Sequence, residues 1–232
     1  MSVVGAKELH KLRNNIDVLP GGFGRALLMA VDGSFANRCF LNDVPERTTV
    51  VARIRKDAGL RKALPKDKRI GNRKYGAELP TPDQMLSDPE VPTHELNLMV
   101  GGRVHTIKYK VVENVCWQRA TGDTPARVIL LKPLGYRLNK GSKLLYRQPG
   151  YLFVTGDDIN IADAIKAYLL RWEIEVSFRD EKTILDTGKA QVWNQQSVQK
   201  SPAFLVACYA ALLLASITAL NDRRNEQFDP LA

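Results

Sequence analysis

The segment ALLMAVDGSFANRCFLNDVPERTTVVARI, residues 26–54, decides the fold class. It begins with an uncharged apolar run that ends in Asp32, and this pattern predicts a central strand buried on both faces of a sheet. Residues 34–41 suit a short helix, and residues 48–54 are rich in the β-branched residues typical of a second strand. The segment therefore predicts a βαβ unit with Asp32 at the carboxyl end of its first strand, where ligands and catalytic groups gather in open α/β sheets.

The rest of the chain divides into regions of different character. Residues 1–19 are expected to form a short helix and a turn, and residues 64–92 a polar, Pro-rich connection. Residues 93–155 contain short β runs separated by Gly and Pro, which is typical of a small antiparallel β subdomain. Helices return at residues 161–185 and in the apolar stretch 203–220.

The charge of the chain is concentrated in two places. The 232 residues carry a net charge of +9. Residues 53–74 hold ten basic residues and two acids, and residues 132–147 hold five basic residues and no acid. Such blocks neutralise phosphates and release their counterions, whereas a solvated basic loop is the alternative. We expect a polyanionic partner, most often a nucleic acid, contacted by Arg53, Arg55 and Lys56.

Other classes of site find little support. The cysteines form no CxxC pair and the histidines show no i,i+4 metal spacing. No P-loop and no serine nucleophile elbow occur.

Residues 203–220 are uncharged and about long enough to cross a bilayer. A buried helix in the core of a cytosolic protein explains a single Ala-rich stretch better, and a membrane-anchored basic protein is the alternative. The N-terminus has charges where a signal peptide needs its apolar core. We expect a cytoplasmic protein that does not use a membrane.

Residues 161–185, IADAIKAYLLRWEIEVSFRDEKTIL, predict one helix with a distinctive face. If each residue advances about 100° around the axis, an arc of about 60° contains Tyr168, Arg171, Glu175 and Lys182. The other acids of the segment lie off this arc, so the geometry selects Glu175, with two cations beside it that suit work near phosphates. Ordinary i,i+4 ion pairs, such as Arg171 with Glu175, are the alternative.

These four residues spell Tyr-x2-Arg-x3-Glu-x6-Lys, which resembles the signature of a large group of DDE transposases of bacterial insertion sequences. The resemblance extends over about residues 24–220, and further stretches carry it: RWEIEVSFRDEK (171–182), VDGSFANR (31–38) and VVARIRKDA (50–58). It implies an α/β, ribonuclease H-like core interrupted by an antiparallel β insertion subdomain, with C-terminal helices.

The family holds two divalent ions, Mg²⁺ or Mn²⁺, with two Asp and one Glu. Two ions about 3.5–4 Å apart activate the attacking oxygen and stabilise the leaving oxygen in phosphodiester displacement. By the resemblance, Asp32 and Glu175 would be catalytic and metal-binding residues.

The resemblance also implies contacts to DNA. Tyr168, Arg171 and Lys182 would hold transposon-end DNA near the scissile phosphate. Trp117, in the insertion, would stack on an extruded base, whereas a core position is the alternative. Double-stranded DNA, at the transposon ends and at the target, would be the partner, and the protein would be associated with the nucleoid. The chain would form a homodimer or pair with a full-length transposase.

One catalytic residue of the family pattern has no counterpart. The context of Asp32 matches the second Asp, and the residues before it are too few for three strands and a helix. Asp17 lies in NNIDVLP, which has no strand pattern. We therefore expect a partial core that lacks the first strands, an N-terminally truncated copy. A sheet without these strands would expose an edge and apolar surface.

The expected division has four parts. Residues 1–55 would be the first part of the core, residues 56–155 the basic linker and β insertion, residues 156–224 the helical remainder with Glu175, and residues 225–232 a tail. The expected function is DNA transposition by metal-dependent strand cleavage and transfer, with catalysis in doubt. The alternative is a non-catalytic DNA-binding remnant that inhibits a full-length transposase.

Overall fold

The computed structural model describes residues 2–69, 71, 74–100, 103–136, 143–156, 159–187, 189 and 192–220. The chain divides into two compact units, residues 1–98 with 105–169 and residues 99–104 with 170–232. Its elements in chain order are α1 (Ser2–Asp17), β1 (Leu27–Val31), α2 (Arg38–Leu41), β2 (Thr48–Arg53), β3 (Arg61–Ala63), a 3₁₀ turn (Lys66–Lys68), β4 (Tyr75–Glu78), α3 (Pro82–Ser87), β5 (His94–Val100), β6 (Arg103–Cys116), β7 (Ala126–Leu131), β8 (Gly135–Tyr136), β9 (Leu145–Tyr146), β10 (Gly150–Thr155), α4 (Ile161–Leu170), α5 (Trp172–Thr183) and α6 (Gln195–Leu220).

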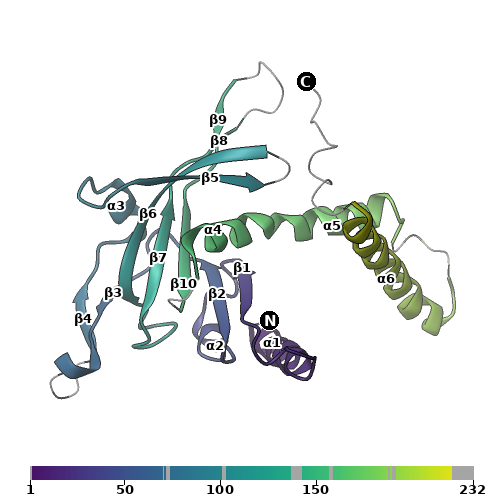
Figure 1. Ribbon diagram of the computed structural model, residues 1–232, viewed down its shortest axis with the longest axis horizontal. Helices are drawn as coiled ribbons and strands as arrows, with labels where there is room; N and C mark the ends of the chain where they lie inside the picture. The colour runs from purple at the N-terminus through teal and green to yellow at the C-terminus, as the bar shows by residue number, and fades with distance from the viewer. Residues whose placement is uncertain are drawn as a thin grey trace. The chain divides into compact units, whose positions relative to one another are not determined.

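An eight-stranded, mostly antiparallel sheet organises the first unit (Figure 1). Its strand order is β1-β2-β10-β7-β6-β3-β4, and β5 pairs with β6. β1 and β2 are parallel, in a register that runs from Leu27↔Thr48 to Val31↔Ala52. The helix α2 lies between them in sequence, so the predicted βαβ unit is confirmed.

β1 is an edge strand, and the prediction of a central strand buried on both faces is wrong. In the strand order β1 pairs with β2 alone, and Leu28 on β1 is 40% exposed. The continuous apolar pattern does describe the strands further in. All six residues of β7 are buried, as are the four central residues of β10.

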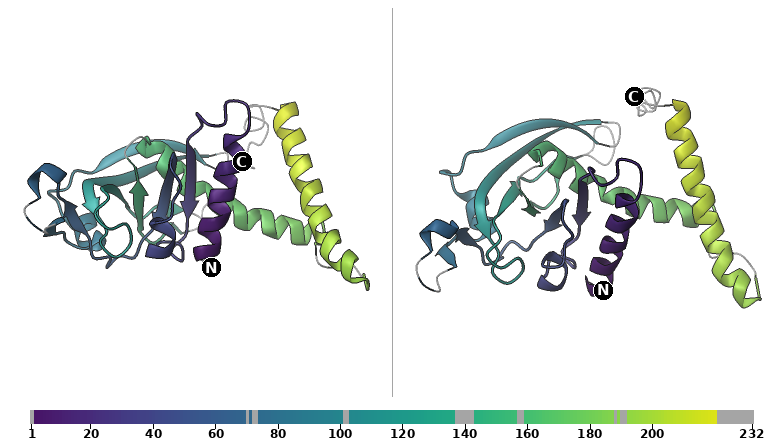
Figure 2. Two further views of the ribbon diagram at one scale, coloured as in Figure 1. Left: turned by 90° about the horizontal axis from the view of Figure 1, so that it is seen from below. Right: turned by 60° about the horizontal axis from the view of Figure 1, so that its bottom comes forward.

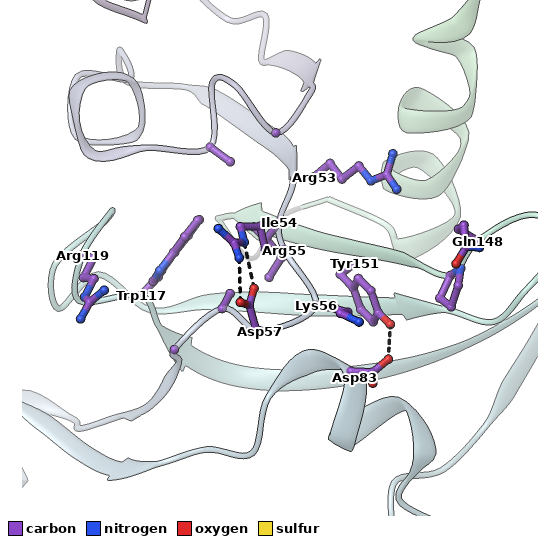
Figure 3. A pocket seen from close by; sticks show the side chains of 15 residues that line it. Arg53, Ile54, Arg55, Lys56, Asp57, Asp83, Trp117, Arg119, Gln148 and Tyr151 are labelled. Atoms are coloured by element: carbon purple, nitrogen blue, oxygen red, sulfur yellow. Dashed lines mark hydrogen bonds and ion pairs between the residues drawn. The ribbon is translucent and has the colours of Figure 1, made fainter.

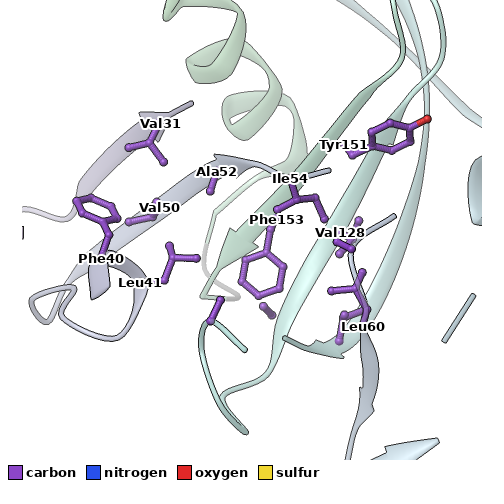
Figure 4. Packing of buried hydrophobic residues seen from close by; sticks show 14 of the residues in the cluster. Val31, Phe40, Leu41, Val50, Ala52, Ile54, Leu60, Val128, Tyr151 and Phe153 are labelled. Carbon is purple, nitrogen blue, oxygen red and sulfur yellow. The ribbon is translucent and has the colours of Figure 1, made fainter. Parts of the chain in front are cut away.

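Alternate residues of the central strands face two separate hydrophobic clusters. On one face, Val50 of β2, Phe153 of β10 and Phe40 of α2 pack in one cluster (Figure 4). Ala6 and Leu9 of α1 belong to the same cluster. Met85 of α3 belongs to the same cluster. The helices α1, α2 and α3 therefore cover one face of the sheet.

The opposite face is covered by α4. Val51 of β2 and Leu152 of β10 pack there against Ala164 and Ile165 of α4. The β5–β6 hairpin adds Ile107 to this cluster. The first unit thus has three layers, and Figure 2 shows it from two further directions.

The strands between residues 93 and 155 belong to the same sheet as the βαβ unit. β10 pairs antiparallel with β2, with Leu152 opposite Arg53 and Val154 opposite Val51. The separate β subdomain expected from the sequence is therefore continuous with the first strands. The connection expected at residues 64–92 also contains regular structure, namely β4 and α3.

Contacts at both ends fix the position of α3. At its start, Thr81 and Gln84 form a capping box and Pro82 occupies the first turn. At its end, the buried Lys110 of β6 donates through Nζ to the carbonyl oxygen of Asp88 at 2.5 Å. Because side chains alternate between the two faces of a strand, Lys110 faces away from Ile107. α3 covers Lys110 on that face.

The helical region differs from the predicted single helix. Two helices, α4 and α5, meet at Arg171, whose backbone stays in the right-handed helical region (φ −53°, ψ −32°). Because the division into two units falls here, Tyr168 belongs to the first unit and Glu175 to the second.

The apolar stretch near the C-terminus forms α6, which is longer than predicted. By length and composition, α6 over Gln195–Ala219 qualifies as a candidate membrane span. None of its apolar stretch is buried in the described part of the chain, so the prediction of a buried core helix is wrong. Phe204, Leu212 and Ile217 are among its exposed side chains.

Substituting Phe153→Ala should destabilise the first unit strongly. Phe153 of β10 is fully buried in the cluster on the face covered by α1, α2 and α3, and its ring meets Trp117 edge-on, with centroids 5.5 Å apart. Removing a buried phenylalanine ring costs about 3–5 kcal/mol of unfolding free energy. Urea unfolding followed by Trp117 fluorescence, in a chain that also carries Trp172→Phe and Trp193→Phe, measures the loss. The control Val18→Ala, at a side chain 83% exposed, should change stability by less than about 0.5 kcal/mol. Equal losses in both variants would contradict the packing described.

Candidate nucleic-acid interface

A hollow of about 940 Å³ lies in the first unit where β2 ends (Figure 3). Its walls come from five stretches of chain that are far apart in sequence. The lining residues are Gly33, Ala36, Arg53, Ile54, Arg55, Lys56, Asp57, Ala58, Gly59, Asp83, Trp117, Arg119, Gln148, Pro149 and Tyr151. We call it the basic pocket.

The pairing of β2 with β10 positions the floor of the basic pocket. The N–H of Ile54, just after β2, donates to the carbonyl oxygen of Tyr151 at 2.8 Å. α3 is attached nearby, since the N–H of Asp83 donates to the carbonyl oxygen of Lys56 at 3.1 Å. The residues that follow β2 are therefore held between β10 and α3.

Four cations line the basic pocket: Arg53, Arg55, Lys56 and Arg119. Three of them are the residues that the sequence predicted as DNA contacts, and the structure brings all three to one place. Each of the four is exposed. A group of exposed cations in a hollow can neutralise the phosphates of a nucleic-acid backbone.

Asp57 is paired with one of these cations. The guanidinium of Arg55 donates to both of its carboxylate oxygens, at 2.9 and 2.8 Å. This hydrogen bonding from Arg55 lowers the pKa of Asp57 below its ordinary value, so the carboxylate stays ionised. An incoming phosphate would compete with Asp57 for Arg55.

Trp117 contributes an aromatic wall and also packs in the core. Its ring meets Phe153 edge-on and is half-buried, and it also lines the pocket beside Arg119 (Figure 3). The sequence left two interpretations of Trp117 open, a core position and a contact with an extruded base. They are compatible, because the half-buried ring packs on Phe153 while the residue also lines the pocket. An aromatic side chain beside cations is the combination that binds unpaired bases.

The far wall contains a buried tyrosine. The hydroxyl of Tyr151 donates to Asp83 Oδ1 at 2.6 Å (Figure 3). Burial, together with this bond to the Asp83 carboxylate, raises the pKa of Tyr151 to about 12. Tyr151 therefore stays a neutral hydrogen-bond donor at physiological pH and fixes α3 against β10.

The predicted catalytic residue Asp32 follows β1 directly and is exposed. Its Oδ1 accepts hydrogen bonds from the backbone N–H of Ser34 at 2.8 Å and from the Ser34 hydroxyl at 2.6 Å. These bonds orient the carboxylate, and its neighbour Gly33 lines the basic pocket. Asp32 therefore lies at the pocket's border.

The predicted residues of the helical region occupy two units. Tyr168 is half-buried and packs on the cluster beneath α4. In the second unit, Arg171 Nη1 and Glu175 Oε1 form an i,i+4 ion pair at 3.3 Å. This is the alternative that the sequence analysis gave for these two residues. Lys182 is exposed and lies seven residues beyond Glu175 on the same helix.

Asp32 and Glu175 are oxygen donors of the kind that Mg²⁺ takes. Among the described residues, however, no group of three or more carboxylate, imidazole or thiolate side chains could hold a metal ion. The described residues do not supply a complete ligand set within either unit.

The remainder of the basic block has other partners. Arg69 pairs with Asp123 at 2.6 Å, and Arg61 lies near Glu78 at 3.9 Å. Arg73, Arg137 and Lys140 lie outside the described residues. Arg61 and Arg69 are therefore partly neutralised by neighbouring acids.

Sequence reasoning missed Arg119 and Gln148 in the pocket. Arg119 follows Trp117 by two residues, and that proximity was the available signal. No signal in the sequence identified Gln148, because it comes near the end of β2 only through the pairing of β10 with β2.

No protein-family model and no curated protein matches this chain.

Titration of the tyrosines should reveal Tyr151 as the last to ionise. Its folded pKa of about 12 lies above the ordinary value of 10.0, so the neutral form is favoured by folding. This contribution to stability is fully present below about pH 10 and is lost as the pH rises through about 12. Ultraviolet absorbance of tyrosinate measures the titration.

Two variants test the assignment of this titration. Tyr151→Phe should remove the late step, whereas the control Tyr146→Phe, at a residue 65% exposed, should keep it. A late step that survives in Tyr151→Phe would show that another tyrosine carries it.

Proposed function

We propose that the chain binds DNA in the basic pocket and derives from a DDE-type transposase with a ribonuclease H-like core. The observation that carries the proposal is that Arg53, Arg55, Lys56 and Arg119 line one hollow together with Trp117. Cations and an aromatic ring in a hollow suit a nucleic-acid strand with an unpaired base better than a small neutral molecule.

The position of Asp32 supports the same proposal. Its neighbour Gly33 lines the basic pocket, so a strand held there passes close to the carboxylate. The parallel β1–β2 pair places Asp32 at a carboxyl end, where α/β sheets collect catalytic groups. The resemblance assigns Asp32 and Glu175 to a site for two Mg²⁺ or Mn²⁺ ions.

The proposed role of the helical residues follows from the resemblance. Transposon-end DNA would be held by Tyr168, Arg171 and Lys182. Glu175 would supply the Glu among the carboxylates that bind the metal ions. The Arg171–Glu175 ion pair would have to open or reorient for Glu175 to take a metal, because Glu175 Oε1 now accepts from Arg171.

The second candidate is a DNA-binding protein that inhibits a full-length transposase by occupying its ends. The ion pair of Glu175 with Arg171 favours this candidate, because it occupies the carboxylate that would take a metal. Both candidates place the protein in the cytoplasm on DNA and share the basic pocket, so they differ in cleavage and not in binding.

Removing two pocket cations together, Arg53→Ala with Lys56→Ala, should weaken DNA binding about tenfold and reduce its salt dependence. Binding is measured by quenching of Trp117 fluorescence in a chain that also carries Trp172→Phe and Trp193→Phe. The matched control removes two exposed lysines of α1, Lys7→Ala with Lys11→Ala. If both pairs weaken binding equally, net charge and not the pocket governs affinity.

Purified chain should bind transposon-end DNA with Mg²⁺ present but should not nick it, because Glu175 Oε1 accepts from Arg171 and is not available to a metal. Asp32→Asn and Glu175→Gln should leave binding unchanged. A strand-cleavage assay with labelled ends measures both. Nicking that needs Mg²⁺ and disappears in either variant would favour an active transposase over the inhibitor.

A further inference from the structure

The turn that follows β2 is held in one position by backbone hydrogen bonds. Its own bond runs from the N–H of Ala58 to the carbonyl oxygen of Arg55, at 3.2 Å. From outside the turn, the N–H of Asp83 donates to the carbonyl oxygen of Lys56 at 3.1 Å. Ala58 is also buried. The backbone of residues 55–58 is therefore fixed at the wall of the basic pocket, and its side chains can exchange partners without moving it.

Two charged side chains of this turn are paired although both are exposed. The Arg55 side chain is 84% exposed and that of Asp57 is 56% exposed. The carboxylate of Asp57 accepts through one oxygen from Arg55 Nε and through the other from Arg55 Nη2 (Figure 3). A guanidinium binds two oxygens of a phosphate with the same two-pronged geometry. Asp57 therefore occupies the donors of Arg55 that phosphate oxygens would take.

Arg55 differs in this respect from the other cations of the basic pocket. Within the described part of the chain, no ion pair with an acid is formed by the other three, Arg53, Lys56 and Arg119. The second acid that lines the pocket, Asp83, accepts instead from the Tyr151 hydroxyl at 2.6 Å. A phosphate therefore meets three cations directly but has to displace a carboxylate from the fourth.

We propose that Asp57 is a built-in competitor of the nucleic-acid backbone, so that a phosphate reaches Arg55 only by displacing this carboxylate. This role rests on the proposed binding of DNA in the basic pocket and names the residue that limits its affinity. An exposed ion pair shifts an equilibrium by up to about fivefold. Because the pair is neutral as a whole, Arg55 also releases few counterions when it changes partner. Asp57 thus weakens binding, reduces its dependence on salt and eases release of the strand.

The variant Asp57→Asn keeps the size of the side chain and removes its charge. It should tighten binding of a labelled DNA duplex with a single-stranded end about fivefold. It should also steepen the slope of log affinity against log salt concentration by about 0.7–0.9, the value for one further phosphate contact. Fluorescence anisotropy with the full chain at several salt concentrations measures both. The matched control Asp67→Asn removes an exposed acid of the same basic stretch outside the pocket, and should change affinity by less than about twofold.

A double-mutant cycle separates competition for Arg55 from general repulsion of phosphate. In a chain that carries Arg55→Gln, Asp57 has no guanidinium to release, so Asp57→Asn should tighten binding only about twofold. An equal gain with and without Arg55 would show that Asp57 merely repels phosphate, and would overturn the inference. Equal gains from Asp57→Asn and Asp67→Asn would overturn it too, because net charge would then explain both.

The same measurements distinguish failure of this inference from failure of the proposed function. DNA binding that Asp57→Asn leaves unchanged would overturn the role of Asp57 and leave the proposed DNA binding standing. A chain that binds no DNA either with or without Asp57→Asn would overturn both. Circular dichroism checks that each variant is folded, and a gain in affinity is not a result that misfolding would produce.

Discussion

The antiparallel pairing of β2 with β10 is the contact on which the rest of the first unit depends. It joins a parallel βαβ unit to strands that follow much later in the chain, and places Leu152 opposite Arg53. The Thr155 hydroxyl reinforces it by accepting from the N–H of Val50 at 2.8 Å. Because both strands are buried on both faces, they form the centre of two hydrophobic clusters. The basic pocket opens where this pairing ends.

Buried polar contacts then shape the pocket. Lys110 and Tyr151 are both nearly inaccessible, and both hold α3, one through backbone carbonyls and the other through Asp83. A buried ammonium or phenol without such a partner would be costly, so each contact specifies one position for α3. The chemistry of the pocket thus rests on contacts that never touch a ligand.

The helices of the second unit, unlike those of the first, are largely exposed. α5 has no buried residue in the structure, and the described part of α6 exposes large apolar side chains along its length. Hydrophobic surface of this extent is unusual on a soluble monomer. Helical spacing alone explains the Arg171–Glu175 pair, because residues four apart are neighbours on any helix.

The local features follow from the sequence alone. The βαβ unit, the short β runs at β7 and β10, and the cations at residues 53–56 could be predicted from the pattern of neighbouring residues, but the burial of β7 and β10 was not predicted. The fold, and not the local pattern, shows that β1 is an edge strand, that β10 lies beside β2, and that Trp117 lines the same hollow as the cations. The physical reason is that hydrophobic periodicity reports which faces of a segment avoid water, whereas the neighbour of each strand depends on contacts between distant residues.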